Sequence, residues 1–195
     1  MSKKDEILKL YDEYKNTFKD KEFVPGEGNE NAHLVLVGEA PGKDEVKLSR
    51  PFVGMAGKNL DEFLSIIGVE RQDIYITNAI KYRLSKVNSE TGRVSNRPAT
   101  TDEIKSSREY LLKEMELIKP SIIVTLGNVP LRSVIGSQND GIGAVHGKIM
   151  PLIINGNEYR LYPLYHPASI IYNRSLKDTY VADVKNLGEI LRGGL

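Results

Sequence analysis

The chain has 195 residues, 40% of them hydrophobic, and a net charge of +1, which is typical of one soluble domain over residues 1–195. It contains no cysteine, which excludes disulfides, thiolate nucleophiles and cysteine-ligated metal sites. The 27 basic and 26 acidic residues create no global positive field, so binding to nucleic acid would require a local basic patch. No segment approaches the roughly 20 apolar residues of a membrane span, so we expect a cytoplasmic protein without a membrane partner.

Residues 2–15 predict an amphipathic helix that begins with a capping box at Ser2 and Asp5. Its apolar face is expected to hold Ile7, Leu8, Tyr11 and Tyr14. We expect residues 1–22 to form this helix and pack on the body of the domain. A polar, turn-rich stretch follows at 25–32.

Strand-like and helix-like segments then alternate along the chain. Three short apolar runs are typical of strands buried on both faces, at 33–38, 73–78 and 121–127. Helical patterns lie between them at 57–67, which stops at Gly68, and at 101–118, with Thr101 as the expected cap. This alternation predicts an α/β fold, a three-layer α/β/α sandwich around a mostly parallel sheet.

The C-terminal third continues the pattern. We expect a short helix from Asn128 to Gly136, a hairpin of 149–154 with 158–164, and a closing helix over 175–192 that opens at Ser175. Residues 84–100 are polar and rich in turn residues, and they predict a long loop.

Polar side chains follow the predicted strands where ligands bind in open α/β sheets, at the carboxyl ends. Glu39, Asp44 and Glu45 follow the first strand, Asn78 ends the second, and His166 follows the last. Carboxylate, carboxamide and imidazole together suit acid–base chemistry on a planar polar ligand.

Each of these residues also has a purely structural interpretation. A glutamate in such a turn is commonly solvated or caps a helix, and His166 before Pro167 can simply turn the chain. Asn78 can cap the next segment, and Phe52 can be an ordinary core residue. Their combination at several strand ends favours a functional site.

Several stretches together resemble the uracil-DNA glycosylase superfamily, most closely its family 4 type. They are GEAPGKDE at 38, RPFVGMAGKNLDEFL at 50, YITNAIKYR at 75, NRP at 96, IIVTLG at 122, HGK at 146 and YHPASIIYNR at 165. They cover about residues 23–190 in family order. The resemblance implies a monofunctional enzyme, without metal or cofactor, that excises uracil from DNA and leaves an abasic site.

The resemblance also implies roles in catalysis. His166 matches the donor that stabilises charge on O2 of the departing uracil. Glu45 matches the acidic residue that faces the cationic sugar and orients water, and Glu39 competes for this role. Some relatives carry an aspartate directly after this glutamate, where this chain has Ala40.

Other matches imply contacts to the base and the DNA. Asn78 would pair with N3 and O4 of uracil, Phe52 would stack on the base, and the backbone of Gly38, Ala40, Pro41 and Gly42 would hold the uracil carbonyl and the flanking phosphate. The wedge in the minor groove would be Ile170 or Ile171, next to Tyr172 and Asn173. Phosphate contacts are expected from Arg83 and Lys148, and further candidates are Lys81, Arg93, Arg97 and Arg174.

The chain departs from the family pattern in three places. Family 4 proteins hold an iron–sulfur cluster on four cysteines, whose positions fall near Tyr11, Tyr14, Tyr82 and Ser107. Aromatic packing is therefore expected to replace the cluster. Tyr172 stands where an arginine is usual, and residues 86–95 look inserted but lack the histidine of a branch that traps DNA covalently.

We therefore expect turnover by a monomer acting on uracil-containing DNA, associated with the nucleoid when it acts. Two alternatives remain open at this stage. One is a nucleic-acid-binding or base-binding protein that kept the fold and lost catalysis. The other is a glycosylase for another deaminated base, such as hypoxanthine or xanthine.

Overall fold

The computed structural model describes residues 1–137 and 141–194, with the backbone alone for residues 170–172. In this part of the chain, a six-stranded sheet has the order β1-β3-β2-β6-β8-β7. Its strands are β1 (Glu27–Gly28), β2 (Leu34–Gly38), β3 (Tyr75–Asn78), β6 (Ile122–Leu126), β7 (Met150–Ile154) and β8 (Asn157–Leu164). The pairs β3–β2, β2–β6 and β6–β8 are parallel, and the edge strands β1 and β7 are antiparallel to their neighbours. The predicted mostly parallel sheet is confirmed.

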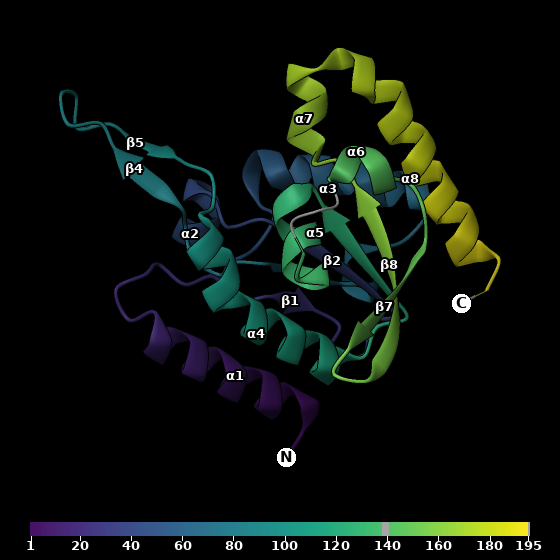
Figure 1. The fold of residues 1–195 in the computed structure, drawn as a ribbon, viewed down its shortest axis with the longest axis horizontal. Coiled ribbons are helices and arrows are strands. Elements are labelled where there is room, and N and C mark those ends of the chain that lie inside the picture. Colours follow the sequence, from purple (N-terminus) through teal and green to yellow (C-terminus); the bar gives the residue numbers. More distant parts are fainter. Residues whose placement is uncertain (138–140, 195) are drawn as a thin grey trace.

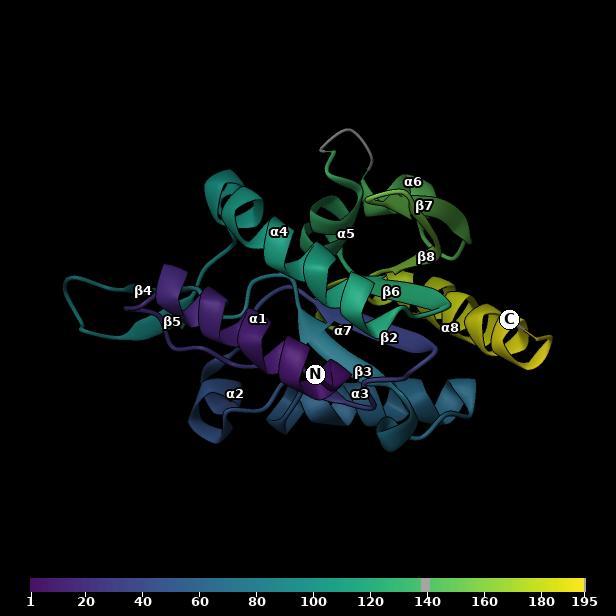
Figure 2. The same ribbon diagram turned by 90° about the horizontal axis from the view of Figure 1, so that it is seen from below.

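Helices cover both faces of the sheet (Figures 1 and 2). On one face lie α4 (Thr101–Ile118), α5 (Asn128–Ile135) and α6 (Ile142–Val145), with α1 (Lys3–Thr17) packed against α4. The other face is covered by α3 (Gly54–Ile67) and α8 (Lys177–Arg192), which contact each other. The three-layer α/β/α sandwich is therefore confirmed.

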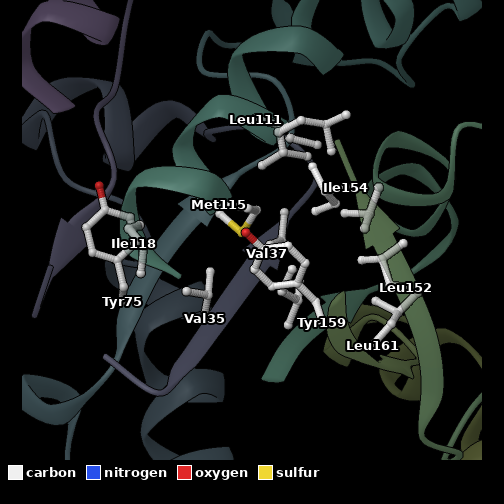
Figure 3. Close-up of a cluster of buried hydrophobic side chains, with 14 of the residues drawn as sticks. Val35, Val37, Tyr75, Leu111, Met115, Ile118, Leu152, Ile154, Tyr159 and Leu161 are labelled. Atoms are coloured by element: carbon white, nitrogen blue, oxygen red, sulfur yellow. The ribbon is translucent and has the colours of Figure 1, made fainter. Parts of the chain in front are cut away.

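Alternation along β2 shows why its continuous apolar run forms a central strand. Val35 and Val37 join the cluster under α4 and α5, whereas Leu34 and Leu36 join the cluster under α3 and α8. All of β2 is buried, because successive side chains point to opposite faces and helices cover both. Figure 3 shows the first cluster, in which Val35 and Val37 lie among Met115 of α4 and Leu161 of β8.

The first helix begins at the predicted capping box, where Ser2 and Asp5 cap each other. Its buried face differs from the prediction. Leu8 is 53% exposed, and Leu10 is buried in its place beside Ile7. At 100° per residue, Leu10 lies closer than Leu8 to the direction set by Ile7 and Tyr14, which explains the difference.

Residues 84–100 do not form the predicted long loop. They contain β4 (Ser85–Val87) and β5 (Val94–Asn96), which pair into a separate two-stranded antiparallel sheet. We call residues 84–97 the β-ribbon. It projects from the body of the molecule in both views (Figures 1 and 2).

The remaining differences between the predicted and the observed elements are helix start positions and several short elements. Thr100, not Thr101, is the N-cap of α4, and its hydroxyl accepts from Glu103 N. Ser175 lies in a 3-10 turn, η2 (Arg174–Leu176), before α8 begins at Lys177. Three short helices have no sequence prediction: α2 (Lys43–Leu48) and α7 (Pro167–Tyr172), which follow β2 and β8, and α6, which precedes β7. A further 3-10 turn, η1 (Arg71–Asp73), precedes β3. None of the described helices is long and apolar enough to cross a membrane.

Candidate active site

The parallel strands deliver their carboxyl ends to one edge of the sheet. Gly38 at the end of β2 is paired in register with Asn78 at the end of β3. The last residue of β8, Leu164, pairs with Leu126 at the end of β6, and His166 follows two residues later. This is the edge at which ligands bind in open α/β sheets.

A cavity of about 290 Å³ opens at this edge. Six predicted site residues line it: Glu39, Ala40, Pro41, Gly42, Glu45 and His166. The remaining lining comes from Ala56 of α3 and from Leu84, Asn96 and Arg97 of the β-ribbon. Its volume lies at the lower limit of about 300 Å³ for drug-sized ligands, so it suits a smaller molecule.

Larger hollows lie elsewhere on the molecule. One of about 490 Å³ lies between α3 and α8, and one of about 740 Å³ lies along β7 and β8. Neither is lined by Glu39, Glu45 or His166. Chemistry rather than size therefore identifies the 290 Å³ cavity as the candidate site.

Both carboxylate oxygens of Glu45 are bound to the backbone. Oε2 accepts from Gly42 N at 2.6 Å, and Oε1 accepts from Phe52 N at 2.6 Å. Burial raises the pKa of Glu45, although these two hydrogen bonds oppose the shift. Glu45 thus clamps the loop after β2 to the segment around Phe52. The Gly42 N–H, expected to bind substrate, is already taken by this clamp.

Glu39 is less constrained than Glu45. Its side chain is half-buried, and its pKa responds to the nearby Ala99 backbone as well as to burial. Burial raises the pKa of the Glu39 carboxyl. The Glu39 carboxyl thus lies at the cavity wall with a raised pKa, a setting in which catalytic carboxylates are commonly found.

His166 enters the cavity as the N-cap of α7. Its Nδ1 accepts a hydrogen bond from Ala168 N at 3.1 Å. An accepting Nδ1 fixes the neutral tautomer that carries its proton on Nε2. Burial lowers the pKa of His166, which also favours the neutral ring. The imidazole therefore offers one N–H donor, at Nε2.

Gly38, Phe52 and Asn78 form a compact group directly behind Glu39. A Cβ on Gly38 would collide with both Asn78 Oδ1 and the Phe52 ring, so only glycine permits this approach. Asn78 is 4% exposed and Phe52 is 7% exposed. No described residue hydrogen-bonds to the Asn78 carboxamide. This group adjoins the cavity but does not line it.

The Phe52 backbone is held in a strained conformation. Its φ of 51° lies in the left-handed region, which costs a residue with a side chain about 1–3 kcal/mol. Arg71 donates to Phe52 O at 3.0 Å and to Pro51 O at 2.8 Å, and it also binds Glu27 at 2.6 Å. Glu45 and Arg71 therefore fix Phe52 from its two ends.

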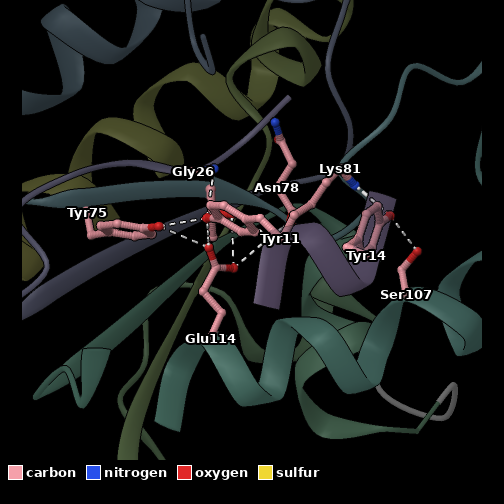
Figure 4. A network of polar contacts seen from close by, with 9 residues as sticks. Tyr11, Tyr14, Gly26, Tyr75, Asn78, Lys81, Ser107 and Glu114 are labelled. Carbon is pink, nitrogen blue, oxygen red and sulfur yellow. Dashed lines mark hydrogen bonds and ion pairs between the residues drawn. The ribbon is translucent and has the colours of Figure 1, made fainter. Parts of the chain in front are cut away.

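A buried polar network lies behind Asn78 (Figure 4). Lys81 Nζ donates to Glu114 Oε2 at 2.6 Å, to Thr77 Oγ1 at 2.7 Å and to Asn78 O at 3.1 Å. Glu114 also accepts from the hydroxyls of Tyr11 and Tyr75. Lys81 is 1% exposed, so the expectation that it contacts a DNA phosphate is wrong.

The residues near the cluster positions of family 4 come together in space. Tyr14 Oη lies 3.0 Å from Ser107 Oγ, and the rings of Tyr14 and Tyr82 have centroids 6.3 Å apart. Tyr11 and Tyr14 both pack on Phe23. Phenol and hydroxyl groups bound to one another, with no thiolate in the chain, do not fit an iron–sulfur cluster.

The predicted DNA contacts lie in varied surroundings. Arg83 Nε donates to Asn96 Oδ1 at 3.1 Å, Lys148 is exposed, and Asn173 Oδ1 accepts from Ser175 Oγ at 2.6 Å. The side chains of Ile170, Ile171 and Tyr172 lie outside the described part of the structure, so their roles stay predictions. Arg97 forms an ion pair with Glu103 at 2.6 Å.

Sequence reasoning assigned no role to two residues of this region. Asn96 begins the NRP motif, to which the sequence assigns no role, and in the structure it lines the cavity. Arg71 lies 19 positions from Phe52 in a 3-10 turn, where no local pattern marks it. Only the fold brings these side chains to the site.

Comparison with known proteins places this geometry in a family. The model of the uracil DNA glycosylase superfamily matches residues 25–186. A type-4 uracil-DNA glycosylase of Archaeoglobus fulgidus is 38% identical over 171 residues, 86% of this chain and 81% of that protein. One from Saccharolobus solfataricus is 37% identical over 175 residues, 88% of this chain and 77% of that protein. One from Pyrobaculum aerophilum is 34% identical over 199 residues, 97% and 95% of the two chains. The chain belongs to the uracil-DNA glycosylase superfamily.

Proposed function

We propose that this chain is a monofunctional DNA glycosylase that hydrolyses the N-glycosidic bond of uracil in DNA and leaves an abasic site. The observation that supports this most directly is that Glu39 and His166, which follow different strands, line one cavity. A carboxylate and a neutral N–H donor at one small site suit hydrolysis with an anionic leaving group.

His166 would stabilise the leaving base. Uracil departs with negative charge spread over N1 and O2, and a fixed donor beside O2 lowers the barrier most when water is excluded. The Nε2–H of the buried, neutral imidazole is such a donor. Because Nδ1 is tied to the backbone of α7, this donor is oriented before substrate binds.

Glu39 would orient the attacking water. Glu45 has both oxygens hydrogen-bonded to the backbone, at Gly42 N and Phe52 N, which commits its carboxylate to holding these two segments together. We therefore assign Glu45 a positioning role and give Glu39 the role of base. The Glu39 carboxylate would also face the positive charge that develops on the sugar.

Asn78 and Phe52 would select the base. A carboxamide offers one donor face and one acceptor face, which match O4 and N3–H of uracil and oppose the reversed edge of cytosine. The Asn78 carboxamide has no hydrogen bond from a described residue, so it is available for this pairing. Phe52 lies against Gly38 beside it, where its ring would stack on the base.

The test uses end-labelled single-stranded and duplex oligonucleotides that contain one uracil, hypoxanthine, xanthine or thymine. Alkali then cleaves each abasic site. We expect the wild-type chain to cleave at uracil. Glu39→Gln should lower the single-turnover rate by about 100-fold, as expected for loss of a general base. His166→Asn should lower it by about 100-fold, as expected for loss of a preorganised donor, and asparagine retains an N-cap acceptor for α7.

Glu13→Gln is the matched control for the carboxylate change, because Glu13 is exposed on α1. Its rate should equal that of the wild type. Cleavage at hypoxanthine or xanthine but not at uracil would assign the chain to another deaminated base. A chain that binds these oligonucleotides and cleaves none of them would be a base-binding protein, and either result rejects the proposal.

A further inference from the structure

The β-ribbon is an ordered element whose base belongs to the cavity wall. Leu84, Asn96 and Arg97 at its base line the cavity. At its tip, Asn88 Oδ1 accepts from the backbone of Glu90 and Thr91 at 2.9 Å each. The tip is therefore a structured turn, and the ribbon projects from the body as a defined arm (Figures 1 and 2).

Polar contacts fix the base of the β-ribbon to the body. Arg97 binds both oxygens of Glu103 at 2.6 and 2.8 Å, and Glu103 in turn belongs to the capping box of α4. Arg97 N donates to Leu84 O at 3.1 Å, which closes the ribbon where it leaves the body. The direction of the arm relative to the cavity is thereby set.

One face of the β-ribbon continues the cavity wall outward. Asn96 Nδ2 lies beside Gly42, 4.0 Å from where a Cβ on that glycine would be. Val87 pairs with Val94, and strand alternation places both on the same face as Asn96, about 7 Å further out. Val87 is 66% exposed and Val94 is 47% exposed. An uncovered apolar pair therefore stands beside the cavity mouth.

The β-ribbon also carries an excess of positive charge. It holds Lys86, Arg93 and Arg97 against one acidic residue, Glu90, in a chain of net charge +1. Lys86 and Arg93 are exposed, and no ion pair links either of them to a described carboxylate. Strand alternation places Lys86 and Arg93 on the face opposite the two valines, so the ribbon offers cations on one face and an apolar pair on the other. Both features complement a polyanion that also presents sugar and base surfaces.

We propose that the β-ribbon is a DNA-binding arm that contacts DNA with both faces: Lys86 and Arg93 on one face contact phosphates near the extruded nucleotide, and the Val87–Val94 pair on the cavity face packs on sugar or base. This inference rests on the proposed function. The distance of about 7 Å from Asn96 to the valines corresponds to about two nucleotide steps along a duplex, at about 3.4 Å per step.

A second copy of the chain fits this surface less well than DNA does. A symmetric contact would bring like charges of two ribbons together. Two valines per ribbon are also far less apolar surface than the roughly 800 Å² per partner of a stable interface. DNA complements both the positive charge of Lys86 and Arg93 and the small apolar surface of the valine pair.

The test measures binding rather than catalysis, so it stands apart from the proposed activity. The probe is a fluorescein-labelled 20-base-pair duplex with a central tetrahydrofuran abasic site, followed by anisotropy between 50 and 200 mM salt. Lys86→Gln with Arg93→Gln should weaken binding about tenfold or more near 0.1 M salt. It should also reduce the slope of log K against log salt by about 1.8, because two phosphate contacts are lost.

Lys4→Gln with Lys9→Gln is the matched control, since it removes the same charge from exposed positions on α1, a helix that contributes no residue to the cavity lining. The arm is excluded if the ribbon variant keeps the wild-type slope, or if this control lowers the slope equally. Val87→Thr with Val94→Thr should weaken binding a few-fold and leave the slope unchanged. If it instead converts a dimer to a monomer in light scattering, a second copy covers the valines and the proposal fails.

Discussion

His166 owes its protonation state to one backbone contact. Ala168 N donates to Nδ1, and a protonated Nδ1 would lose this bond and face the N–H of the helix end. Burial shifts the pKa of the group in the same direction, downward from 6.5. The proposed mechanism uses the neutral imidazole of His166, and the lowered pKa should keep this ring neutral even at mildly acidic pH.

The prediction is that His166 titrates below pH 6.5 and carries its proton on Nε2. The unfolded chain binds this proton at about pH 6.5 and the folded chain only at lower pH, so His166 lowers the free energy of unfolding as pH falls below about 6.5. The chain has three histidines, so a ¹⁵N-histidine NMR titration resolves each one. His33→Gln and His146→Gln assign the other two signals. A pKa at or above 6.5, or a proton on Nδ1, contradicts this prediction.

Phe52 and Arg71 provide a second prediction at this scale. Arg71→Lys removes the guanidinium that binds the carbonyls of Pro51 and Phe52 together, and a single ammonium cannot replace that geometry. With Phe52 less firmly held in the left-handed region, kcat/KM for uracil excision should fall about tenfold, which corresponds to one lost hydrogen bond of about 1.4 kcal/mol.

Arg50→Lys is the matched control for this change. Arg50 also binds Glu27, at 2.8 Å, whereas it is Arg71 that donates to the carbonyls of Pro51 and Phe52. Its kcat/KM should stay within twofold of the wild type. If kcat/KM falls equally in the two variants, the ion pairs to Glu27, rather than the hold on the Phe52 backbone, determine the rate.

At the scale of elements, apolar patterning determined how much could be predicted. The strands β2, β3 and β6 were found from the sequence because each is a continuous apolar run buried on both faces. The strands β4 and β5 were missed because they are polar apart from Val87 and Val94, and pairing and turn contacts rather than burial form them. Sequence patterns report burial, so an exposed ribbon gives no signal.

The candidate site could be predicted in the same uneven way. Glu39 and His166 were found because the strand-end rule needs only the order of strands and loops. The clamp by Glu45 on Gly42 N and Phe52 N could not be predicted, because it joins a helix start to a segment seven residues away whose path depends on tertiary structure. Arg71 and Asn96 could not be predicted for the same reason, because tertiary structure alone brings them to the site.

For the whole molecule, the Lys81–Glu114 pair joins three elements: α1, α4 and the segment at the end of β3. Glu114 lies on α4, Lys81 follows β3, and Tyr11 of α1 donates to Glu114 from outside the sheet (Figure 4). Both charged groups are at most 1% exposed. In a chain without the cysteines of family 4, hydrogen bonds and ring packing therefore attach the N-terminal helix to the domain.

Removal of one partner of this pair should be far more costly than removal of both. Lys81→Met or Glu114→Gln alone leaves buried polar groups unpaired and should lower the free energy of unfolding by about 3–5 kcal/mol. The double variant Lys81→Met with Glu114→Leu should recover much of this loss. Urea unfolding gives the values, and Lys113→Met with Glu109→Gln, an exposed pair at 2.7 Å on α4, should change them by less than about 1 kcal/mol. If single changes in the buried pair cost no more than this surface control, the network does not hold these elements together.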